Sequence, residues 1–336
     1  MSSDSTRAKR VLVTGAAGGL GARLVARLVD RGWKVRGLVL AGDPLARRLE
    51  WLGCEIREGD VSDAASLRGA FDGIDTVYHL AAVIVSNDPT VFGRVNRDGT
   101  ANVVEASRAA GVHHLVYVSS ASVTYPRRTP YAESKLEAEA IVSGVSSIEH
   151  TIVRPTLVYD ERGGQELAMF RDYLLRFPVV PFIGDGRAKK RPVWSEDLVD
   201  GLARIAGNAA AYGKTYNLSG GESISMLDFA RLILHHRGID KPFLHVPVPI
   251  CRAVAHAMRL TMKSPPLTTS AIAGIVQDAD LDPSEATRDL DYRPIGVREG
   301  FARCFPVEEA PAEGQADFFT AGPIPTRKGS SKRSSQ

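Results

Sequence analysis

Cysteine is scarce in this sequence, and the pattern of the few present excludes two kinds of protein. Cys54, Cys251 and Cys304 lie far apart, are odd in number, and form no Cys-x-x-Cys pair. A disulfide-rich secreted domain needs an even set of cysteines, and a structural zinc site needs paired ligands. We therefore expect a reducing, cytoplasmic location and no metal site.

A strong excess of charge and long apolar runs are also missing. The 42 Lys and Arg residues nearly balance the 39 Asp and Glu residues, which leaves a formal net charge of +3. This balance gives no argument for a nucleic-acid partner. No run approaches the roughly 18 apolar residues of a membrane-spanning helix. No apolar signal segment precedes the first predicted strand, so we expect no transmembrane segment.

The chain does contain a regular alternation of short apolar strands and helices in its first half. Strands are predicted at 10–14, 34–40, 55–58, 75–80, 114–119 and 151–154. Helical spacing or composition between them occurs at 24–29, 91–110 and 131–142. This alternation predicts an α/β fold, a doubly wound parallel sheet of the Rossmann type with helices on both faces.

A glycine-rich turn follows the first predicted strand and opens the first helix. It reads Thr14-Gly15-Ala16-Ala17-Gly18-Gly19-Leu20-Gly21. Gly15 permits a tight turn, Gly18 a close approach of the backbone to a pyrophosphate, and Gly21 close packing of the helix on the strand. Free N–H groups and the positive dipole end at a helix start favour phosphate. The turn therefore predicts a dinucleotide site, with a ligand-free glycine turn as the alternative.

The residue that ends the second strand normally distinguishes NAD from NADP. An acid there binds the ribose hydroxyls of NAD, whereas an Arg binds the 2′-phosphate of NADP. Leu40 occupies that place, and Asp43 comes slightly later. Arg47 and Arg48 are most simply a solvated helix face. We therefore expect NAD, with NADP left open.

Residues after the third and fourth strands are candidates for the adenosine side of the cofactor. Asp60 is either an acceptor for the adenine amino group, with Val61 against the ring, or a helix cap. The small residues that follow His79 leave room for a nucleoside; they are Leu80, Ala81 and Ala82. We interpret His79 as a satisfied, partly buried histidine and not as a catalyst.

Tyr131 and Lys135 are four residues apart on a predicted helix, so they share one face. A lysine ammonium and a positive nicotinamide ring both favour the phenolate of a tyrosine and lower its pKa. Ser120 ends the fifth strand, where its hydroxyl can hydrogen-bond a reacting oxygen. The alternative is a Tyr/Lys pair on a wet helix face. Asn96 is a candidate for a backbone bond and proton relay, or for a packing contact.

The pattern loosens after residue 158. Pro and Gly break the stretch 160–187, which leaves room for one helix. Further helices are predicted at 195–207, 226–237 and 297–304, with a short strand at 215–218 and otherwise Pro-punctuated chain. We predict an NAD(P)-binding domain at 8–158, to which 189–215 contributes, and a smaller, mainly substrate-binding domain at 159–307. Residues 308–336 lack periodicity and predict a disordered tail.

Several motifs together resemble the extended and atypical short-chain dehydrogenase/reductases, the NAD-dependent epimerase/dehydratase family. Besides the glycine turn, the matching segments are Gly59-Asp60-Val61, His79-Leu80-Ala81-Ala82, Asn96-Arg97-Asp98-Gly99-Thr100, Val118-Ser119-Ser120-Ala121, Tyr131-Ala132-Glu133-Ser134-Lys135, Arg154-Pro155, Asp282-Pro283-Ser284-Glu285-Ala286 and Leu290-Asp291-Tyr292-Arg293-Pro294. The resemblance covers roughly residues 9–305. It implies that Ser120, Tyr131 and Lys135 form a catalytic triad. The cofactor set that it implies is Gly15, Gly18, Gly19, Leu20, Gly21, Asp60, Val61, Leu80, Ala81, Ala82, Lys135 and Pro155.

Departures from the family's motifs bear on the substrate. Nucleotide-sugar members usually carry an Asn where Leu157 stands here. Their substrate-binding Arg has either Lys190 or Arg191 as its counterpart. The segment Arg154-Pro155-Thr156-Leu157-Val158-Tyr159 is more similar to the hydroxysteroid- and ketone-reducing branch, and also to a nucleotide-binding accessory subunit of respiratory complex I.

Three functions follow from these observations. The first is an NAD(P)-dependent oxidoreductase that interconverts a secondary alcohol and a ketone. The second is a nucleotide-sugar epimerase or dehydratase that retains its NAD. The third is a non-catalytic nucleotide-binding protein, against which the intact Ser120, Tyr131 and Lys135 set counts. The resemblance also implies a homodimer formed through the helices at 91–110 and 131–142.

Overall fold

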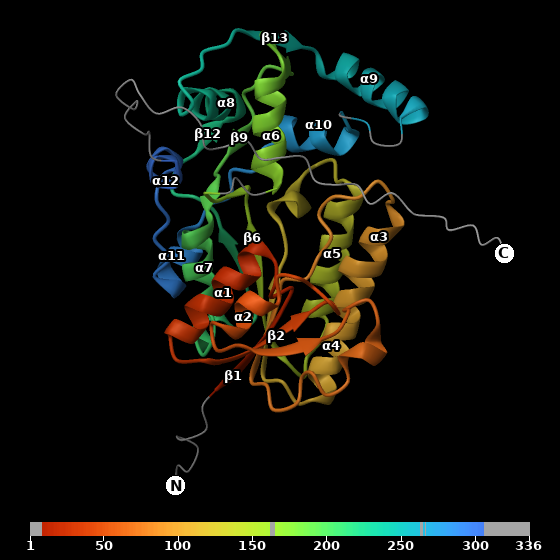
Figure 1. The fold of residues 1–336 in the computed structure, drawn as a ribbon, viewed down its shortest axis with the longest axis vertical. Coiled ribbons are helices and arrows are strands. Elements are labelled where there is room, and N and C mark those ends of the chain that lie inside the picture. Colours follow the sequence, from red (N-terminus) through yellow and green to blue (C-terminus); the bar gives the residue numbers. More distant parts are fainter. Residues whose placement is uncertain (1–8, 162–164, 263–264, 266, 306–336) are drawn as a thin grey trace, which may run out of the picture.

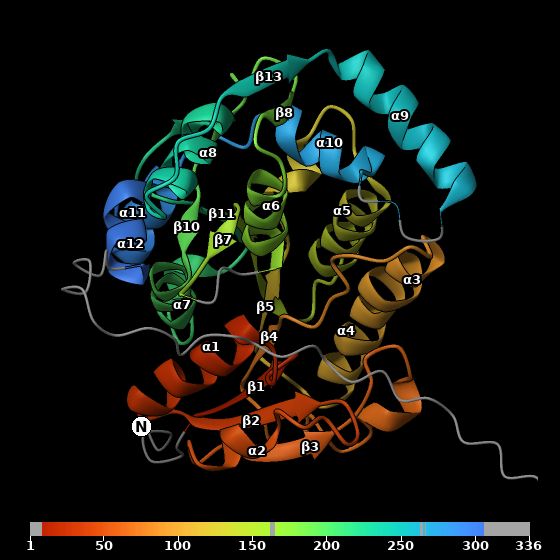
Figure 2. The same ribbon diagram turned by 45° about the horizontal axis from the view of Figure 1, so that its top comes forward.

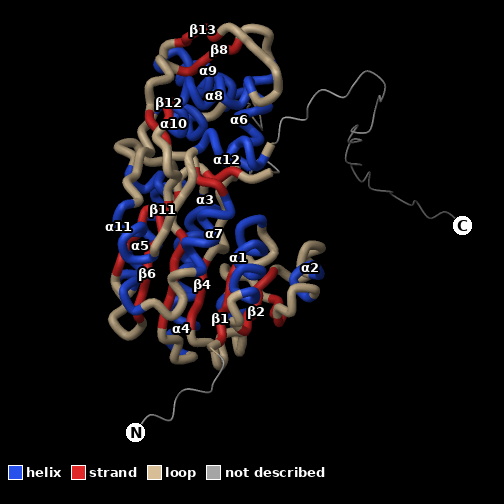
Figure 3. Tube along the Cα trace, turned by 90° about the vertical axis from the view of Figure 1, so that its left-hand side faces the viewer, coloured by secondary structure: helices blue, strands red, loops and turns tan. Residues whose placement is uncertain are grey.

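The computed structural model describes residues 9–161, 165–262, 265 and 267–305. Two lobes follow one another along the long axis of the molecule, as Figure 1 and the turned view in Figure 3 show. The lobe near the N-terminus holds the sheet, and the other lobe holds most of the later helices. The predicted disordered tail at 308–336 lies outside the described residues.

A seven-stranded, all-parallel sheet forms the first lobe, which confirms the predicted fold class. The strand order is β11-β6-β5-β4-β1-β2-β3, so the order reverses between β1 and β4. The strands are β1 (Arg10–Thr14), β2 (Lys34–Val39), β3 (Glu55–Glu58), β4 (Thr76–His79), β5 (His114–Val118), β6 (Glu149–Pro155) and β11 (Lys214–Leu218). Central strands are covered on both faces, so β4 and β5 are buried throughout, whereas the edge strand β3 is mostly exposed.

Two layers of helices cover the two faces of this sheet. One face carries α1 (Gly19–Asp30), α2 (Arg47–Glu50) and α7 (Ser195–Ala203), whose apolar side chains share a core with β1, β2 and β11. The other face carries α4 (Gly99–Ala109) and α5 (Pro130–Ser143), which share a second core with β4 and β5. Figure 2 shows the two layers on either side of the strands.

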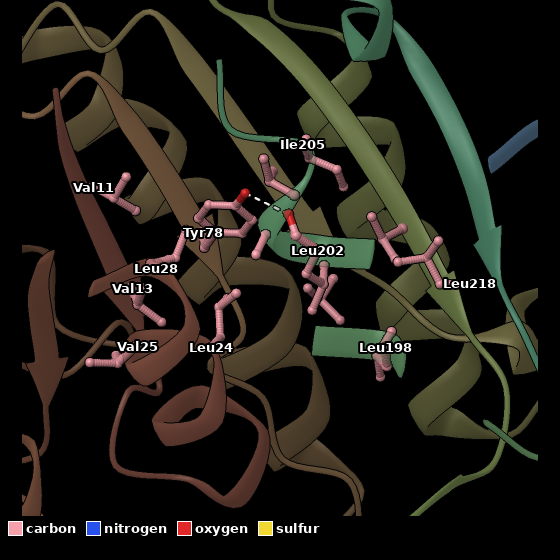
Figure 4. Close-up of a cluster of buried hydrophobic side chains, with 14 of the residues drawn as sticks. Val11, Val13, Leu24, Val25, Leu28, Tyr78, Leu198, Leu202, Ile205 and Leu218 are labelled. Carbon is pink, nitrogen blue, oxygen red and sulfur yellow. Dashed lines mark hydrogen bonds between the residues drawn. The ribbon is translucent and has the colours of Figure 1, made fainter. Parts of the chain in front are cut away.

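Residues far along the chain return to complete this lobe. β11 pairs with β6 in parallel, and α7 packs against α1. The Tyr78 hydroxyl at the sheet centre donates to the Leu202 carbonyl at 2.7 Å (Figure 4). Ion pairs join α1 to α7 along their length, and their members are Arg23, Arg27, Arg31, Glu196 and Asp200. The segment 189–215 therefore contacts the Rossmann core directly.

The second lobe contains small two-stranded sheets and helices that pack around two apolar cores, a larger one with α6, α8 and α12 and a smaller one with α9 and α10. Its strands are β7 (Val158–Tyr159), β8 (Val180–Ile183), β9 (Lys189–Lys190), β10 (Val193–Trp194), β12 (Ile224–Ser225) and β13 (Phe243–Val246). Its helices are α6 (Gln165–Arg176), α8 (Met226–His235), α9 (Val248–Thr261), α10 (Thr269–Val276) and α12 (Val297–Cys304). Helix α11 (Ser284–Leu290) instead packs on β11, and its buried side chains belong to the core of the first lobe. The predicted helices at 226–237 and 297–304 correspond to α8 and α12.

Two sequence-based expectations were wrong in detail. The Pro-punctuated stretch after residue 238 contains three helices, α9, α10 and α11. The prolines do not prevent α9, because Pro247 and Pro249 lie at its start, where a missing N–H costs nothing. The helix predicted at 91–110 is not uniform. It consists of α3 (Thr90–Phe92), a π-helical segment at Gly93–Asp98, and α4.

Candidate active site

The glycine turn between β1 and α1 is tightly packed against its surroundings. Gly15 has φ of 66°, and a Cβ there would lie 2.9 Å from the Ala81 backbone nitrogen. At Gly21 a Cβ would lie 2.2 Å from the Gly15 carbonyl oxygen, so glycine is required where α1 contacts the turn. Gly18 caps α1 with φ of −67°, and a Cβ there would meet only the Gly15 oxygen at 3.2 Å. A side chain at Gly18 would therefore be tight against one backbone oxygen, a much milder conflict than at Gly15 or Gly21.

The first turn of α1 begins at Gly19 and Leu20, at the carboxyl edge of the sheet. Its leading N–H groups lack intrahelical partners and lie at the positive end of the helix dipole. A glycine backbone without side chains at the start of such a helix fits a pyrophosphate. The residues present therefore fit a dinucleotide cofactor.

Arg48 is not part of a solvated helix face, which corrects the sequence-based interpretation. Its guanidinium donates to the carbonyl oxygens of Ala17 and Gly18 in the glycine turn. Its Nε atom is buried and has no hydrogen-bond partner among the described residues. Arg47 is exposed as expected, and Leu40 after β2 is 57% exposed. The Arg48 guanidinium therefore borders the glycine turn, and the residue after β2 is not an acid.

Asp60, after β3, holds a tight turn. Its Oδ1 accepts from the backbone nitrogen and the hydroxyl of Ser62, both at 2.8 Å. The helical cap that was the alternative for Asp60 is made by Asp63, whose side chain accepts from the Ala65 nitrogen. Val61 is buried, and its carbonyl accepts from the Asn102 amide.

His79 is buried and hydrogen-bonded, as the sequence suggested. One ring nitrogen lies 2.7 Å from the Thr14 hydroxyl and the other 3.0 Å from the Thr100 hydroxyl. Burial lowers the pKa of His79 to about 3, so the ring is neutral at ordinary pH. The Thr14 hydroxyl also accepts from the Ala81 nitrogen at 3.1 Å, which ties the glycine turn to the segment after β4. Leu80, Ala81 and Ala82 are half-buried beside that turn.

Asn96 lies in the π-helical segment and connects two parts of the site. Its Oδ1 accepts from the Val83 nitrogen at 2.8 Å, and its Nδ2 donates to the Val83 carbonyl at 2.9 Å. The same Nδ2 donates to the Ser134 hydroxyl at 3.1 Å, and that hydroxyl donates to the Tyr131 carbonyl. Asn96 therefore hydrogen-bonds the Val83 backbone and holds the segment after β4 against the first turn of α5.

Ser120 follows β5, and Tyr131 lies in the first turn of α5, so both are at the carboxyl edge of the sheet. The Ser120 hydroxyl lies 2.9 Å from the Ser122 hydroxyl and accepts from the Ser122 nitrogen. Thr129 caps α5, and Pro130 occupies its first turn, which sets where the helix begins. Tyr131 is half-buried, with its ring 6.2 Å from that of Phe92.

Lys135 is buried one turn further along α5. Its Nζ donates to the Val118 carbonyl at the end of β5 at 2.7 Å and lies 4.3 Å from the centre of the Tyr117 ring. Burial lowers the pKa of Lys135 to about 7, while the Glu139 carboxylate acts in the opposite direction. At neutral pH only part of the Lys135 population is therefore charged, whereas the sequence argument had treated it as an ammonium.

Glu139 and Arg154 were missed by sequence reasoning. Glu139 is 5% exposed and pairs with Arg154, whose Nε lies 2.9 Å from Oε1. Glu139 follows Lys135 by four residues, so the helical spacing already indicated that the two side chains lie on the same face of α5. Arg154 directly precedes the buried Pro155, so this ion pair holds the end of β6 against α5.

Lys190 and Arg191, the two alternatives for a substrate-binding cation, have different surroundings. The Lys190 ammonium donates to the Gln277 carbonyl and lies 3.4 Å from the Tyr125 hydroxyl, beside the segment between Ser120 and Tyr131. The Arg191 guanidinium instead pairs with Asp280. Gln277 also exchanges two hydrogen bonds with the Arg127 backbone, so the second lobe touches the segment that precedes Tyr131.

A hollow of about 650 Å³ lies in the second lobe, away from these residues. It is bordered by β8, the start of α9 and the end of α10, and none of the predicted site residues lines it. The carboxyl edge of the sheet, and not this hollow, brings the glycine turn, Ser120, Tyr131 and Lys135 to one side of the molecule. Within the described residues there is no group of three His, Cys, Asp or Glu side chains that could hold a metal.

A parallel sheet with this strand order, and a glycine turn at the point where the order reverses, define a Rossmann-type dinucleotide-binding protein. A model of the NAD dependent epimerase/dehydratase family matches residues 11–219, and the chain belongs to that family. It is accordingly an enzyme of the NAD-dependent dehydrogenase and epimerase class.

Known relatives agree with this assignment over most of the chain. A 3 beta-hydroxysteroid dehydrogenase/Delta 5-->4-isomerase of Mycobacterium tuberculosis is 30% identical over 90% of this chain and 91% of its own length. A 2-alkyl-3-oxoalkanoate reductase of Stenotrophomonas maltophilia is 28% identical over 88% of this chain and 98% of its own. The dTDP-glucose 4,6-dehydratase DesIV of Streptomyces venezuelae, solved with NAD and TYD, has a TM-score of 0.69 and 22% identity over 88% of this chain and 95% of its own. This last likeness shows the fold. No helix in the described part of the chain is long and apolar enough to cross a membrane.

Proposed function

We propose that this enzyme interconverts a secondary alcohol and a ketone, with Ser120, Tyr131 and Lys135 as its catalytic residues. The observation that carries the proposal is the position of Lys135, a buried lysine one turn from Tyr131 whose Nζ reaches the Val118 carbonyl two residues before Ser120. A buried lysine is costly, and sites of chemistry are where such groups concentrate.

A nicotinamide cofactor held at the glycine turn and the ends of β4 and β6 would supply the hydride donor or acceptor for the reacting carbon of the substrate. The Tyr131 hydroxyl gives its proton to the carbonyl oxygen in reduction and takes a proton from the alcohol in oxidation. The Ser120 hydroxyl donates a hydrogen bond to the same oxygen. Lys135 exchanges protons near neutral pH because its pKa is about 7, and its charged form favours the Tyr131 phenolate.

We assign the cofactor to the Rossmann lobe, formed by residues 8–158 with 189–215, and the substrate mainly to residues 159–307. The cofactor residues are those around the glycine turn and the ends of β3, β4 and β6, namely Gly15, Gly18, Gly19, Leu20, Gly21, Asp60, Val61, Leu80, Ala81, Ala82, Lys135 and Pro155. Lys190 and Arg191 both stay candidates for a substrate contact; Lys190 lies beside the segment between Ser120 and Tyr131, and Arg191 pairs with Asp280. A homodimer through α4 and α5 and a cytoplasmic location belong to the same proposal; sedimentation of the purified protein tests the dimer.

Two observations favour an oxidoreductase over a nucleotide-sugar epimerase. Leu157, which replaces the usual Asn, packs against the apolar core of the second lobe. The curated relatives with matches over most of the chain include proteins named as dehydrogenases and reductases. An epimerase keeps its NAD through purification, whereas an oxidoreductase exchanges it. Absorbance and mass analysis of the purified protein, followed by assays with ketones and UDP-sugars, separates the two functions.

The proposal predicts a large effect of Tyr131→Phe, which removes the hydroxyl and keeps the ring. Turnover should fall by about 10²–10⁴-fold, the usual contribution of a general acid or base. Calorimetry should still detect NAD binding. Tyr212→Phe is the matched control, because Tyr212 precedes β11 at the opposite edge of the sheet. Near-normal turnover of Tyr131→Phe would rule out the acid/base role.

A further inference from the structure

Helix α9 exposes three large apolar side chains and buries two small ones, while Val248 and Met258 are half-buried. Cys251 and Ala255 are 5% and 3% exposed, whereas Ile250, Val254 and Leu260 are 54%, 41% and 74% exposed. An amphipathic helix that only covers a core shows the reverse arrangement, because burial of large aliphatic side chains stabilises the fold most. The outward face of α9 therefore has an apolar surface that the described core does not use.

The three sides of α9 follow from its spacing. Ile250, Val254 and Ala257 form the outward apolar stripe, and Cys251 and Ala255 lie on the inward stripe, at helical spacing. The remaining stripe is basic and consists of Arg252, His256 and Arg259. Arg252 and Arg259 have no carboxylate partner among the described residues. The helix thus presents an apolar stripe and a basic stripe together.

The sequence around α9 contains no acid. Residues 241–277 include no Asp or Glu, although the whole chain has 39 of them. The same stretch holds Arg252, Arg259 and Lys263. Leu244 in β13 and Met262 after α9 add exposed apolar side chains, at 59% and 45%. This stretch of the chain is therefore positive and apolar, in a protein whose charges are otherwise nearly balanced.

We propose that α9 docks the enzyme on an anionic lipid bilayer, with Ile250, Val254 and Leu260 at the headgroup boundary. Amphipathic helices of this composition lie in the plane of a membrane surface, and each nearby basic residue adds attraction to anionic lipid. Figures 1 and 2 show α9 at the outer rim of the second lobe, where no other labelled element covers its outer side. Such a rim can meet a flat surface without hindrance from the Rossmann lobe.

The charge pattern argues against a second copy of the chain as the occupant. A two-fold contact through α9 would bring Arg252 and Arg259 close to their equivalents, and the acid-free stretch offers no carboxylate to compensate. An anionic bilayer supplies negative charge for the basic stripe of α9 and an apolar layer for its exposed apolar side chains. The inference is independent of the reaction proposed above.

The test uses the full-length protein and flotation with vesicles of phosphatidylcholine, with or without phosphatidylglycerol. The protein should float with the anionic vesicles, less at high salt because screening weakens the attraction, and not with phosphatidylcholine alone. Arg252→Glu combined with Arg259→Glu, and Ile250→Ser combined with Leu260→Ser, should each lower the bound fraction roughly tenfold. Thermal unfolding and NAD binding should be unchanged in both variants, because the replaced side chains are at least partly exposed.

Matched controls lie on the Rossmann lobe. Lys34→Glu combined with Arg68→Glu makes the same change in charge, and Leu45→Ser combined with Trp51→Ser removes exposed apolar side chains that are at least as large. Both controls should float like the parent protein. All variants keep the basic residues at 326–336, so a contribution from that segment is constant.

Three results would overturn the proposal. The first is no flotation of the parent protein with anionic vesicles. The second is equal flotation of the α9 variants and the controls. The third is a sedimenting dimer, dissociated by the α9 substitutions, without vesicle binding; it would assign the face to a second copy.

Discussion

Lys135 shows how one side chain links stability to the proposed chemistry. It is 2% exposed, and its ammonium form has the Val118 carbonyl and the Tyr117 ring as its near neighbours. Desolvation therefore outweighs attraction to Glu139, and the pKa of Lys135 falls to about 7. Below that pH the folded protein must hold a buried positive charge, and above it the charge is lost.

This lowered pKa predicts a pH-dependent effect of Lys135→Met on stability. Between about pH 7 and the ordinary lysine pKa, the unfolded chain binds more protons at this position than the folded one, so the free energy of unfolding rises with pH. Replacement by Met removes that dependence. The stability of Lys135→Met relative to the parent should be greater near pH 6 than near pH 9 by about 2–3 kcal/mol.

Denaturant unfolding at the two pH values measures this difference. Lys34→Met, at an exposed position, should show none of it. An equal stability difference at both pH values would mean that Lys135 does not titrate in this interval.

Individual residues of the site could be named from the sequence only where a motif identified them. Ser120, Tyr131 and the glycines were named as candidates in this way, and the structure places them at the carboxyl edge of the sheet. Arg48 was misjudged because its contact with the glycine turn depends on the path of the chain after β2, which no local pattern encodes. The Arg154 contact with Glu139 likewise depends on how β6 lies against α5.

At the scale of an element, the turn before α1 predicts different effects for substitutions at Gly18 and Gly21: loss of NAD affinity at the first and loss of stability at the second. Gly18→Val should abolish most NAD affinity and keep the fold, at a cost of about 1 kcal/mol for a poorer helix cap. Gly21→Val should unfold or strongly destabilise the protein, because its Cβ would overlap the Gly15 carbonyl. Calorimetric NAD titration and thermal unfolding of both variants check this. Unchanged NAD binding by Gly18→Val would contradict the cofactor assignment.

Elements with a strong local pattern were predictable, and those defined by tertiary partners were not. The strands of the Rossmann core lie within two residues of their predicted ends because continuous apolar runs mark buried parallel strands. β8 and β13 were missed, because Pro178 and Pro181 beside and within the apolar run of β8 indicated a loop. The placement of β11 beside β6 depends on a long connection that the sequence does not describe.

At the scale of the whole molecule, the described body ends soon after α12. Phe301 in that helix is 2% exposed within the core of the second lobe, so a truncation must leave α12 intact. Removal of everything after Val307 should leave melting temperature and turnover unchanged within error, because the removed sequence lacks apolar periodicity. A clear drop in either quantity would show that the C-terminal segment docks on the body. Phe318 and Phe319 would then be the first anchors to replace.

The pairing of β11 with β6 has a consequence for the nascent chain. About 60 residues, which include much of the second lobe and helix α7, separate the end of β6 from the start of β11, so during synthesis β6 leaves the ribosome well before its neighbour. At ~5–20 residues per second, β6 remains an unpaired sheet edge for several seconds. Such an edge invites pairing with other chains. The complete seven-stranded sheet therefore forms only after β11 has been synthesised.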